Sequence, residues 1–222
     1  MHIPDGFLDP YTAIVTYIVM IIFLVIAVLK TSKTLEIRGL SLAITLAAFI
    51  FVAQMIAWPI PGGTSLHMVG GALSAILLGP WMGFIVMFIV LLVQCLVFHD
   101  GGITALGANV LNMGIVATFT GYLIYKAIVY SMDRMGIGIG ESRFLAGLLS
   151  GWISLGLAGT VCGIEIGISG EILNRLGYSL AISVPTMAIW HFILGIVEGF
   201  ITGSIVSYIR SRNIIPIAAE TR

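Results

Sequence analysis

The chain has 222 residues, of which 59% are apolar and only 9% are Asp, Glu, Lys or Arg. Soluble globular domains have about 45–50% apolar and about 25% charged residues, so this chain has too few polar side chains to cover a soluble surface. Ten basic and ten acidic residues cancel, which leaves no bulk charge to attract nucleic acid. The composition predicts a single integral membrane domain over residues 1–222 and excludes a separate soluble catalytic domain.

Membrane-spanning helices are expected wherever about 20 consecutive residues are mostly apolar, because lipid offers the backbone no other hydrogen-bond partner. Seven such segments follow in chain order: Tyr11–Lys30, Gly39–Trp58, the short His67–Leu78, Trp81–Phe98, Gly107–Tyr130, Phe144–Ile164 and Thr186–Ile209. The third and fourth are separated at Gly79-Pro80, since proline removes a backbone donor and disfavours helix in the residue before it. Glycines at four-residue spacing, such as Gly147 and Gly151, predict close helix packing within the bundle or against a partner membrane subunit.

Basic residues determine the expected orientation of the chain. They form three groups: Lys30, Lys33 and Arg38; Lys126, Arg134 and Arg143; Arg210, Arg212 and Arg222. The positive-inside rule places all three groups in the cytoplasm, which requires an even number of membrane crossings between one group and the next. Between the first and second groups, the break at Gly79-Pro80 divides one long apolar run into two spans and so raises the number of crossings to four. The sequence thus predicts an all-α integral membrane protein with seven transmembrane helices, an extracytoplasmic N-terminus and a cytoplasmic C-terminus, with Arg175 as the one external basic residue.

The four histidines, His2, His67, His99 and His191, all fall on the outer side in this topology. Position 2 carries the strongest signal, because Met1 is expected to be retained before a large second residue. The terminal amine, the amide nitrogen of His2 and its Nδ1 can then bind one metal ion at three corners of a square plane. Such nitrogen coordination favours Ni(II) or Cu(II) over zinc, which prefers a tetrahedron. His67, at the end of a glycine-rich loop, is the predicted fourth ligand.

The start of the chain (MHIPDGFL) and the run that ends in His67 (PGGTSLH) resemble the CbiM/NikM family. These proteins are the substrate-binding (S) components of energy-coupling-factor importers for cobalt and nickel. The resemblance extends over essentially the whole chain, and the Pro-Asp-Gly at positions 4–6 is more similar to the nickel branch. It implies a metal held by Met1, His2 and His67. It also implies partners, namely a transmembrane coupling (T) subunit, two cytoplasmic ATPases and, as a further possibility, a small accessory membrane subunit.

Residues that support the ligands are harder to assign. Metal-bound histidines usually donate their other ring proton to a carboxylate, carbonyl or water, and the external polar residues Asp5, Ser65, His99 and Asp100 are candidates for this role. An ordinary turn explains His99 and Asp100 equally well, and Asp5 can form a turn of its own. His191 and Glu198 share one face of the last helix and stay unassigned.

The function expected from the sequence is metal uptake rather than catalysis. The chain lacks a phosphate-binding G-x-x-x-x-G-K-[ST] loop, so it is not expected to use ATP itself or to be an enzyme. We expect a multi-pass component of the cell membrane, surrounded by lipid, that captures Ni(II) as its transported substrate and needs no other cofactor. Two alternatives stay open: the same role for Co(II), and a channel or secondary carrier that acts alone.

Overall fold

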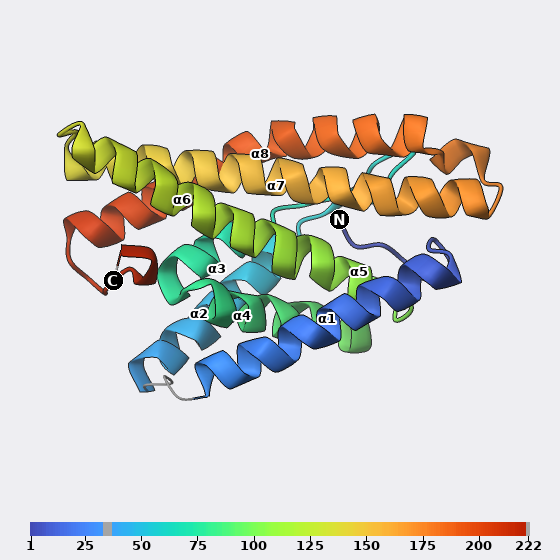
Figure 1. The fold of residues 1–222 in the computed structure, drawn as a ribbon, viewed down its shortest axis with the longest axis horizontal. Coiled ribbons are helices and arrows are strands. Elements are labelled where there is room, and N and C mark those ends of the chain that lie inside the picture. Colours follow the sequence, from blue (N-terminus) through green and yellow to red (C-terminus); the bar gives the residue numbers. More distant parts are fainter. Residues whose placement is uncertain (33–36, 221–222) are drawn as a thin grey trace.

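A computed structural model describes residues 1–32 and 37–220, which form an almost entirely helical bundle (Figure 1). The main helices are α1 (Pro10–Thr31), α2 (Ile37–Gln54), α3 (Gly71–Leu78), α4 (Pro80–Val93), α5 (Leu106–Asn109), α6 (Ala117–Arg134), α7 (Ile139–Ile172) and α8 (Leu180–Ser211). One π-helical turn, η1 (Gln94–Phe98), extends α4, and a second, η2 (Val110–Val116), joins α5 to α6. Two further segments, η3 (Leu176–Tyr178) and η4 (Ala218–Glu220), are short 3₁₀ turns. Two short strands, β1 (Trp58–Pro59) and β2 (Ser65–Leu66), pair antiparallel between α2 and α3.

The helical segments follow the seven expected spans in order, but several differ in length: α3 is shorter than expected, and α7 and α8 are longer. Among the described residues, five helices are long and apolar enough to cross a membrane, and residues 39–54 form a shorter apolar helix. The predicted break at Gly79-Pro80 is confirmed, because α3 ends at Leu78, α4 begins at Pro80 and Gly79 has φ 84°. The expected start of the third span at His67 is wrong: α3 begins only at Gly71 and has eight residues, about 12 Å of helix, which is too short to cross alone.

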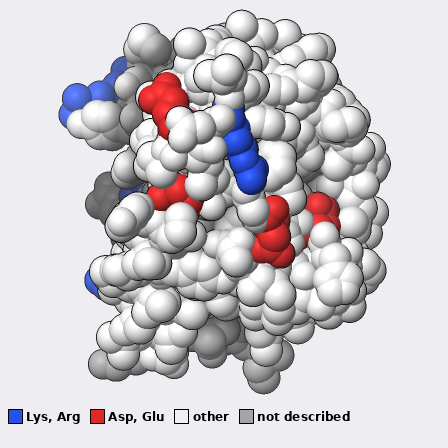
Figure 2. All heavy atoms as spheres, turned by 90° about the vertical axis from the view of Figure 1, so that its right-hand side faces the viewer, with Lys and Arg blue, Asp and Glu red and all other residues white. Residues whose placement is uncertain are grey.

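Helix ends gather at two opposite ends of the bundle. At one end (left in Figure 1) lie the end of α1, the start of α2, the α6–α7 connection and the C-terminal tail, and at the other lie the start of α1 and the α7–α8 connection. Lys30, Arg134 and Arg210 occupy the last turns of α1, α6 and α8, so these basic residues share one end of the molecule. Figure 2 shows the opposite end of the molecule (right in Figure 1), where acidic side chains form separate patches and a basic side chain lies between them. Lys33 and Arg222 lie outside the described residues.

The glycine ladders pack α7 against α8. A Cβ added to Gly147 would lie 2.7 Å from the Cα of Gly203, and one added to Gly151 would lie 2.8 Å from the Cα of Gly199. Any larger residue at these positions would push the two backbones apart. The predicted packing of glycines within the bundle is therefore confirmed for this helix pair.

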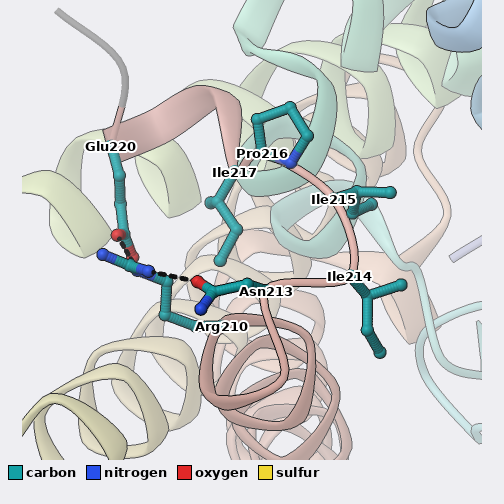
Figure 3. A pocket seen from close by; sticks show the side chains of 7 residues that line it. All are labelled: Arg210, Asn213, Ile214, Ile215, Pro216, Ile217 and Glu220. Atoms are coloured by element: carbon teal, nitrogen blue, oxygen red, sulfur yellow. Dashed lines mark hydrogen bonds and ion pairs between the residues drawn. The ribbon is translucent and has the colours of Figure 1, made fainter.

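The C-terminal tail is fastened to the bundle by Glu220. Its carboxylate accepts hydrogen bonds from the Arg143 Nε (3.0 Å), the Arg210 Nε (2.8 Å) and the Tyr125 hydroxyl (2.7 Å). Figure 3 shows the small pocket that the tail forms with the end of α8, in which Arg210 also donates a hydrogen bond to Asn213. The pocket contains none of the residues predicted to bind metal, which lie elsewhere in the bundle.

Candidate metal centre

The first three residues are inserted into the bundle rather than displayed on its surface. Met1 and Ile3 are fully buried and His2 is 5% exposed. The Ile3 amide donates a hydrogen bond to Asn109 Oδ1 (2.8 Å), and the Ile3 carbonyl accepts hydrogen bonds from Asn109 Nδ2 (3.2 Å) and the Gly102 amide (2.8 Å). Asn109 ends α5 immediately before the π-helical turn η2, a type of distortion that is frequent at functional sites. The N-terminal segment is thus held at a fixed depth.

Ser65, at the start of β2, binds both backbone nitrogens of the predicted chelate. The Met1 amine donates hydrogen bonds to the Ser65 carbonyl (2.5 Å) and to Ser65 Oγ (3.0 Å), and the His2 amide donates to the same Oγ (3.0 Å). Burial lowers the pKa of the Met1 amine to about 5, so the amine is neutral at physiological pH. A neutral amine has two hydrogens, and both are used by Ser65, which leaves its lone pair free for a metal ion.

The imidazole of His2 is held in one tautomer. Its Nε2 lies 3.0 Å from Gln94 Oε1, and because an amide oxygen only accepts hydrogen bonds, Nε2 carries the proton. Its Nδ1 has no hydrogen-bond partner among the described residues and lies 3.4 Å from the Asp100 carboxylate. Burial lowers the pKa of His2 to about 3, so the ring is neutral. An unprotonated nitrogen that faces a carboxylate is a favourable place for a cation between them.

His67 presents its other ring nitrogen. The side chain is fully buried, and its Nδ1 lies 2.7 Å from the Met68 carbonyl, to which it donates a hydrogen bond. Its Nε2 is therefore unprotonated, and it has no partner within the part of the chain that the structure describes. The rings of His2 and His67 are stacked with centroids 4.5 Å apart and an interplanar angle of 21°. The structure thus brings Met1, His2 and His67 together, as the sequence predicted.

Four nitrogens at this site are suited to bind a metal ion: the Met1 amine, the His2 amide, His2 Nδ1 and His67 Nε2. Among the described residues, no three His, Cys, Asp or Glu side chains lie close enough together to hold a metal ion. A metal at this position must therefore be bound largely by the chain terminus and the backbone. Such a site depends on Met1 being residue 1, because an amine exists only at the end of a chain.

Of the four residues expected to support the ligands, two lie at the site and two lie away from it. Ser65 and Asp100 contact the ligands as described above. Asp5 lies further out, where its carboxylate accepts hydrogen bonds from the Thr104 amide (2.8 Å) and hydroxyl (2.6 Å), and these bonds lower its pKa. His99 is exposed and ends η1 with φ 55°, as expected for the turn reading, and it is not among the residues brought to the site.

Three polar residues of the site were not predicted from the sequence. Gln94 and Asn109 are buried amides in otherwise apolar segments, at 0% and 1% exposed, and a lone amide in a membrane span is the signal that could have identified them. His191 of α8 is fully buried and lies near the Met1 amine and His67. Its ring fits because residue 159 is glycine: a Cβ there would lie 2.4 Å from the ring. His191 Nδ1 lies 2.7 Å from the Met187 carbonyl.

A groove leads from the surface toward this site. Its volume is about 590 Å³, and it runs between the N-terminal segment and the β1–β2 hairpin, with Pro4, Phe7, Trp58, Ser65 and Tyr178 among its lining residues. Ser65, which binds the Met1 amine, thus borders the groove. Leu66 and His67, at the end of β2 and directly after it, are buried.

Comparison with known proteins places this chain in a family. Residues 2–214 match the family model CbiM, described as the cobalt uptake substrate-specific transmembrane region. The chain is 50% identical over 211 residues to a protein of Archaeoglobus fulgidus named "Putative fused nickel transport protein NikMN", and this match covers 94% of the chain and 65% of that protein. It is 36% identical over 171 residues to the cobalt transport protein CbiM of Sorangium cellulosum, with 75% and 71% covered.

A solved structure supports the same assignment. The crystal structure of a truncated transition metal transporter superposes with a TM-score of 0.86 at 34% identity, over 96% of this chain and 99% of that one. The long apolar helices and these relatives make the protein a multi-pass membrane protein, expected in the cell membrane. The buried N-terminus, the apolar bundle around it and the match over nearly the whole chain lead to one conclusion: this chain belongs to the CbiM family of metal uptake proteins.

Proposed function

We propose that this protein is the nickel-binding membrane component of an energy-coupling-factor importer. One observation carries the proposal: the Met1 amine, His2 and His67 lie together in a buried part of the bundle and offer nitrogens as ligands, the His2 amide after loss of its proton. Amine, amide and imidazole nitrogens form a strong ligand field, and a square-planar arrangement of nitrogens suits Ni(II). The relative named as a nickel transport protein, 50% identical to this chain, supports the choice of metal.

Binding has a defined proton balance in this proposal. The Met1 amine and both imidazoles are neutral before the metal arrives, so the metal displaces only the His2 amide proton. Ser65 Oγ, 3.0 Å from that amide nitrogen, accepts the amide N–H in the metal-free protein. This hydrogen bond is lost when the proton leaves to solvent. The Asp100 carboxylate, near His2 Nδ1, adds negative charge that favours a divalent cation.

Import requires partners in this proposal. The chain lacks a phosphate-binding loop, so energy comes from two cytoplasmic ATPases through a transmembrane coupling subunit, with a small accessory membrane subunit as a further candidate partner. The N-terminus faces outward and the end that carries Lys30, Arg134 and Arg210 faces the cytoplasm, because basic residues are retained on that side. A protein that carries metal alone would instead give flux in liposomes without ATPases.

Cobalt is the second candidate substrate, favoured by the family description and by the cobalt transport relative. Co(II) uses the same nitrogen ligands, so the described residues do not separate the two ions by type. Direct competition between Ni(II) and Co(II) for the purified protein measures the preference. A higher affinity for Co(II) would assign the protein to cobalt uptake at the same site.

The coordination is tested by titrating the purified protein in detergent with Ni(II) at neutral pH. We expect a yellow, diamagnetic complex at one equivalent, as low-spin square-planar Ni(II) requires. The variant His67→Ala removes the fourth nitrogen and should lose both this spectrum and much of the affinity. A green, paramagnetic complex in the wild type, or equal binding by His67→Ala, would contradict the proposed ligand set.

A further inference from the structure

Glu198, whose role stayed unassigned from the sequence, is a carboxylate enclosed in the bundle. It lies on α8 and is 1% exposed. Its Oε2 accepts a hydrogen bond from the Val69 amide (2.6 Å) and its Oε1 accepts one from the Gly70 amide (2.9 Å). Two consecutive amides therefore point at the same side chain. Gly70 itself adopts φ 78°, a left-handed conformation that glycine takes without strain.

The segment that Glu198 holds is the one that carries His67. Residues 67–70 connect β2 to α3 without helical hydrogen bonds. A second buried side chain, Gln54 of α2, donates from Nε2 to the Val69 carbonyl (2.7 Å). Side chains from α8 and α2 therefore fix this irregular backbone, which is tolerated inside a membrane protein only when its polar groups are satisfied by protein.

One peptide unit connects Glu198 to His67. The Val69 N–H that binds Glu198 and the Met68 carbonyl that binds His67 Nδ1 (2.7 Å) belong to the same peptide bond. Because a peptide bond is planar and trans, its N–H and C=O point in opposite directions, so an acceptor on one side fixes the carbonyl on the other. That carbonyl keeps the proton of His67 on Nδ1 and leaves Nε2 unprotonated.

We propose that Glu198 is a positioning residue for His67, which acts through the Met68–Val69 peptide to hold the imidazole in the orientation and tautomer that bind metal. Carboxylates usually orient metal-bound histidines by direct contact, and here a single peptide stands between the two. Aligned hydrogen bonds polarise one another, so the carboxylate also raises the basicity of the ring. This inference rests on the proposed metal site, since it assigns His67 Nε2 as a ligand.

The variant Glu198→Gln tests the inference with little change in size. A glutamine has one acceptor oxygen, so its NH₂ group must face one of the two backbone N–H donors, and rotation of the Met68–Val69 peptide relieves this conflict. The matched control is Glu165→Gln, which alters another buried carboxyl group (6% exposed), one that accepts its hydrogen bond from Asn112 Nδ2 (2.6 Å) rather than from the segment 67–70. Both variants replace a buried carboxyl group by an amide, but only Glu198 makes hydrogen bonds to the segment that carries His67.

Three measurements decide the outcome. Nickel affinity should fall about 10- to 100-fold in Glu198→Gln and the nickel absorption band should shift, while Glu165→Gln keeps both. The ¹⁵N chemical shifts of His67 without metal should report the Nδ1–H tautomer in the wild type and a tautomer mixture in Glu198→Gln. Wild-type affinity, spectrum and tautomer in a folded Glu198→Gln would overturn the inference.

Failure of the proposed function is distinguishable from failure of this inference. If the wild type gives no square-planar nickel spectrum, the proposed coordination fails, and the ¹⁵N tautomer comparison alone then decides whether Glu198 orients His67. If Glu198→Gln does not fold, two measurements replace it: the ¹⁵N tautomer of His67 in the wild type, and the nickel affinity of the Gln54→Leu variant. That variant removes the second clamp on the same segment and should lower nickel affinity while Glu165→Gln does not. A wild-type His67 with its proton on Nε2 would overturn the inference without any variant.

Discussion

Gln94 offers a sharp test of how the site selects its ligand atoms. Its Oε1 accepts the Nε2 proton of His2 at 3.0 Å, whereas its own Nε2 has no partner among the described residues. In the variant Gln94→Leu the acceptor disappears, and a buried N–H without a partner costs about 1–3 kcal/mol. The ring can avoid this cost by moving its proton to Nδ1, where the Asp100 carboxylate lies 3.4 Å away.

That shift blocks the nitrogen that the metal needs. Nickel binding to Gln94→Leu must restore the unfavourable tautomer, so the affinity should fall by the same 1–3 kcal/mol, or about 5- to 150-fold at 1.4 kcal/mol per tenfold change. The variant Gln94→Glu is the matched control, since it keeps an oxygen acceptor for His2 and removes only the unpaired Nε2 donor. Its affinity should equal or exceed that of the wild type, because the added carboxylate favours a cation.

The assay is a competition titration with a nickel chelator of known affinity, on purified protein in detergent, with the absorption spectrum recorded throughout. Thermal unfolding of each variant without metal shows whether the bundle remains intact. Gln94→Leu binding within twofold of the wild type would refute the tautomer argument. So would an equal loss in Gln94→Glu, because that variant keeps both the size of the side chain and an oxygen acceptor for His2 Nε2.

Three further predictions concern the same site. One residue added before Met1 keeps every side chain but moves the amine away from Ser65, so the yellow nickel complex should be lost, and an unchanged titration would disprove the chelate. The variant His191→Phe fills the space beside Gly159 and leaves the four nitrogens in place, so the nickel affinity should stay within about threefold, roughly 0.7 kcal/mol; loss of the band would instead make His191 a ligand. Burial lowers the pKa of the Met1 amine from 8.0 to about 5, so between these values the unfolded chain binds a proton that the folded chain excludes. The melting temperature of the metal-free protein should therefore fall as the pH is lowered from 8 to 5, and a melting temperature that rises over this range would contradict the buried neutral amine.

Much of the fold was predictable because membranes impose simple rules on a chain. Long apolar runs must be helical, and Gly79-Pro80 breaks one of them for local steric reasons, so the order of the helices followed from composition alone. The extents were less accurate: α7 has 34 residues, about 51 Å of helix, whereas apolarity marks only the part that lipid covers. The start of α3 was misplaced because a distant carboxylate, Glu198, binds the amides of residues 69 and 70.

By itself the sequence determined the membrane class and the order of the helices. It also predicted Met1, His2 and His67 as ligands, since chelation by a terminal amine, an amide and a neighbouring imidazole depends on atoms adjacent in the chain. Only the tertiary structure decided which ring nitrogens are free, because Gln94 and the Met68 carbonyl fix the tautomers of His2 and His67 from elsewhere in the sequence. It also showed that His191 adjoins the site while His99 is exposed, although both are single histidines on the same predicted side. Hydrogen-bond partners 92 residues apart, as in His2 and Gln94, leave no local pattern, so packing alone brings them together.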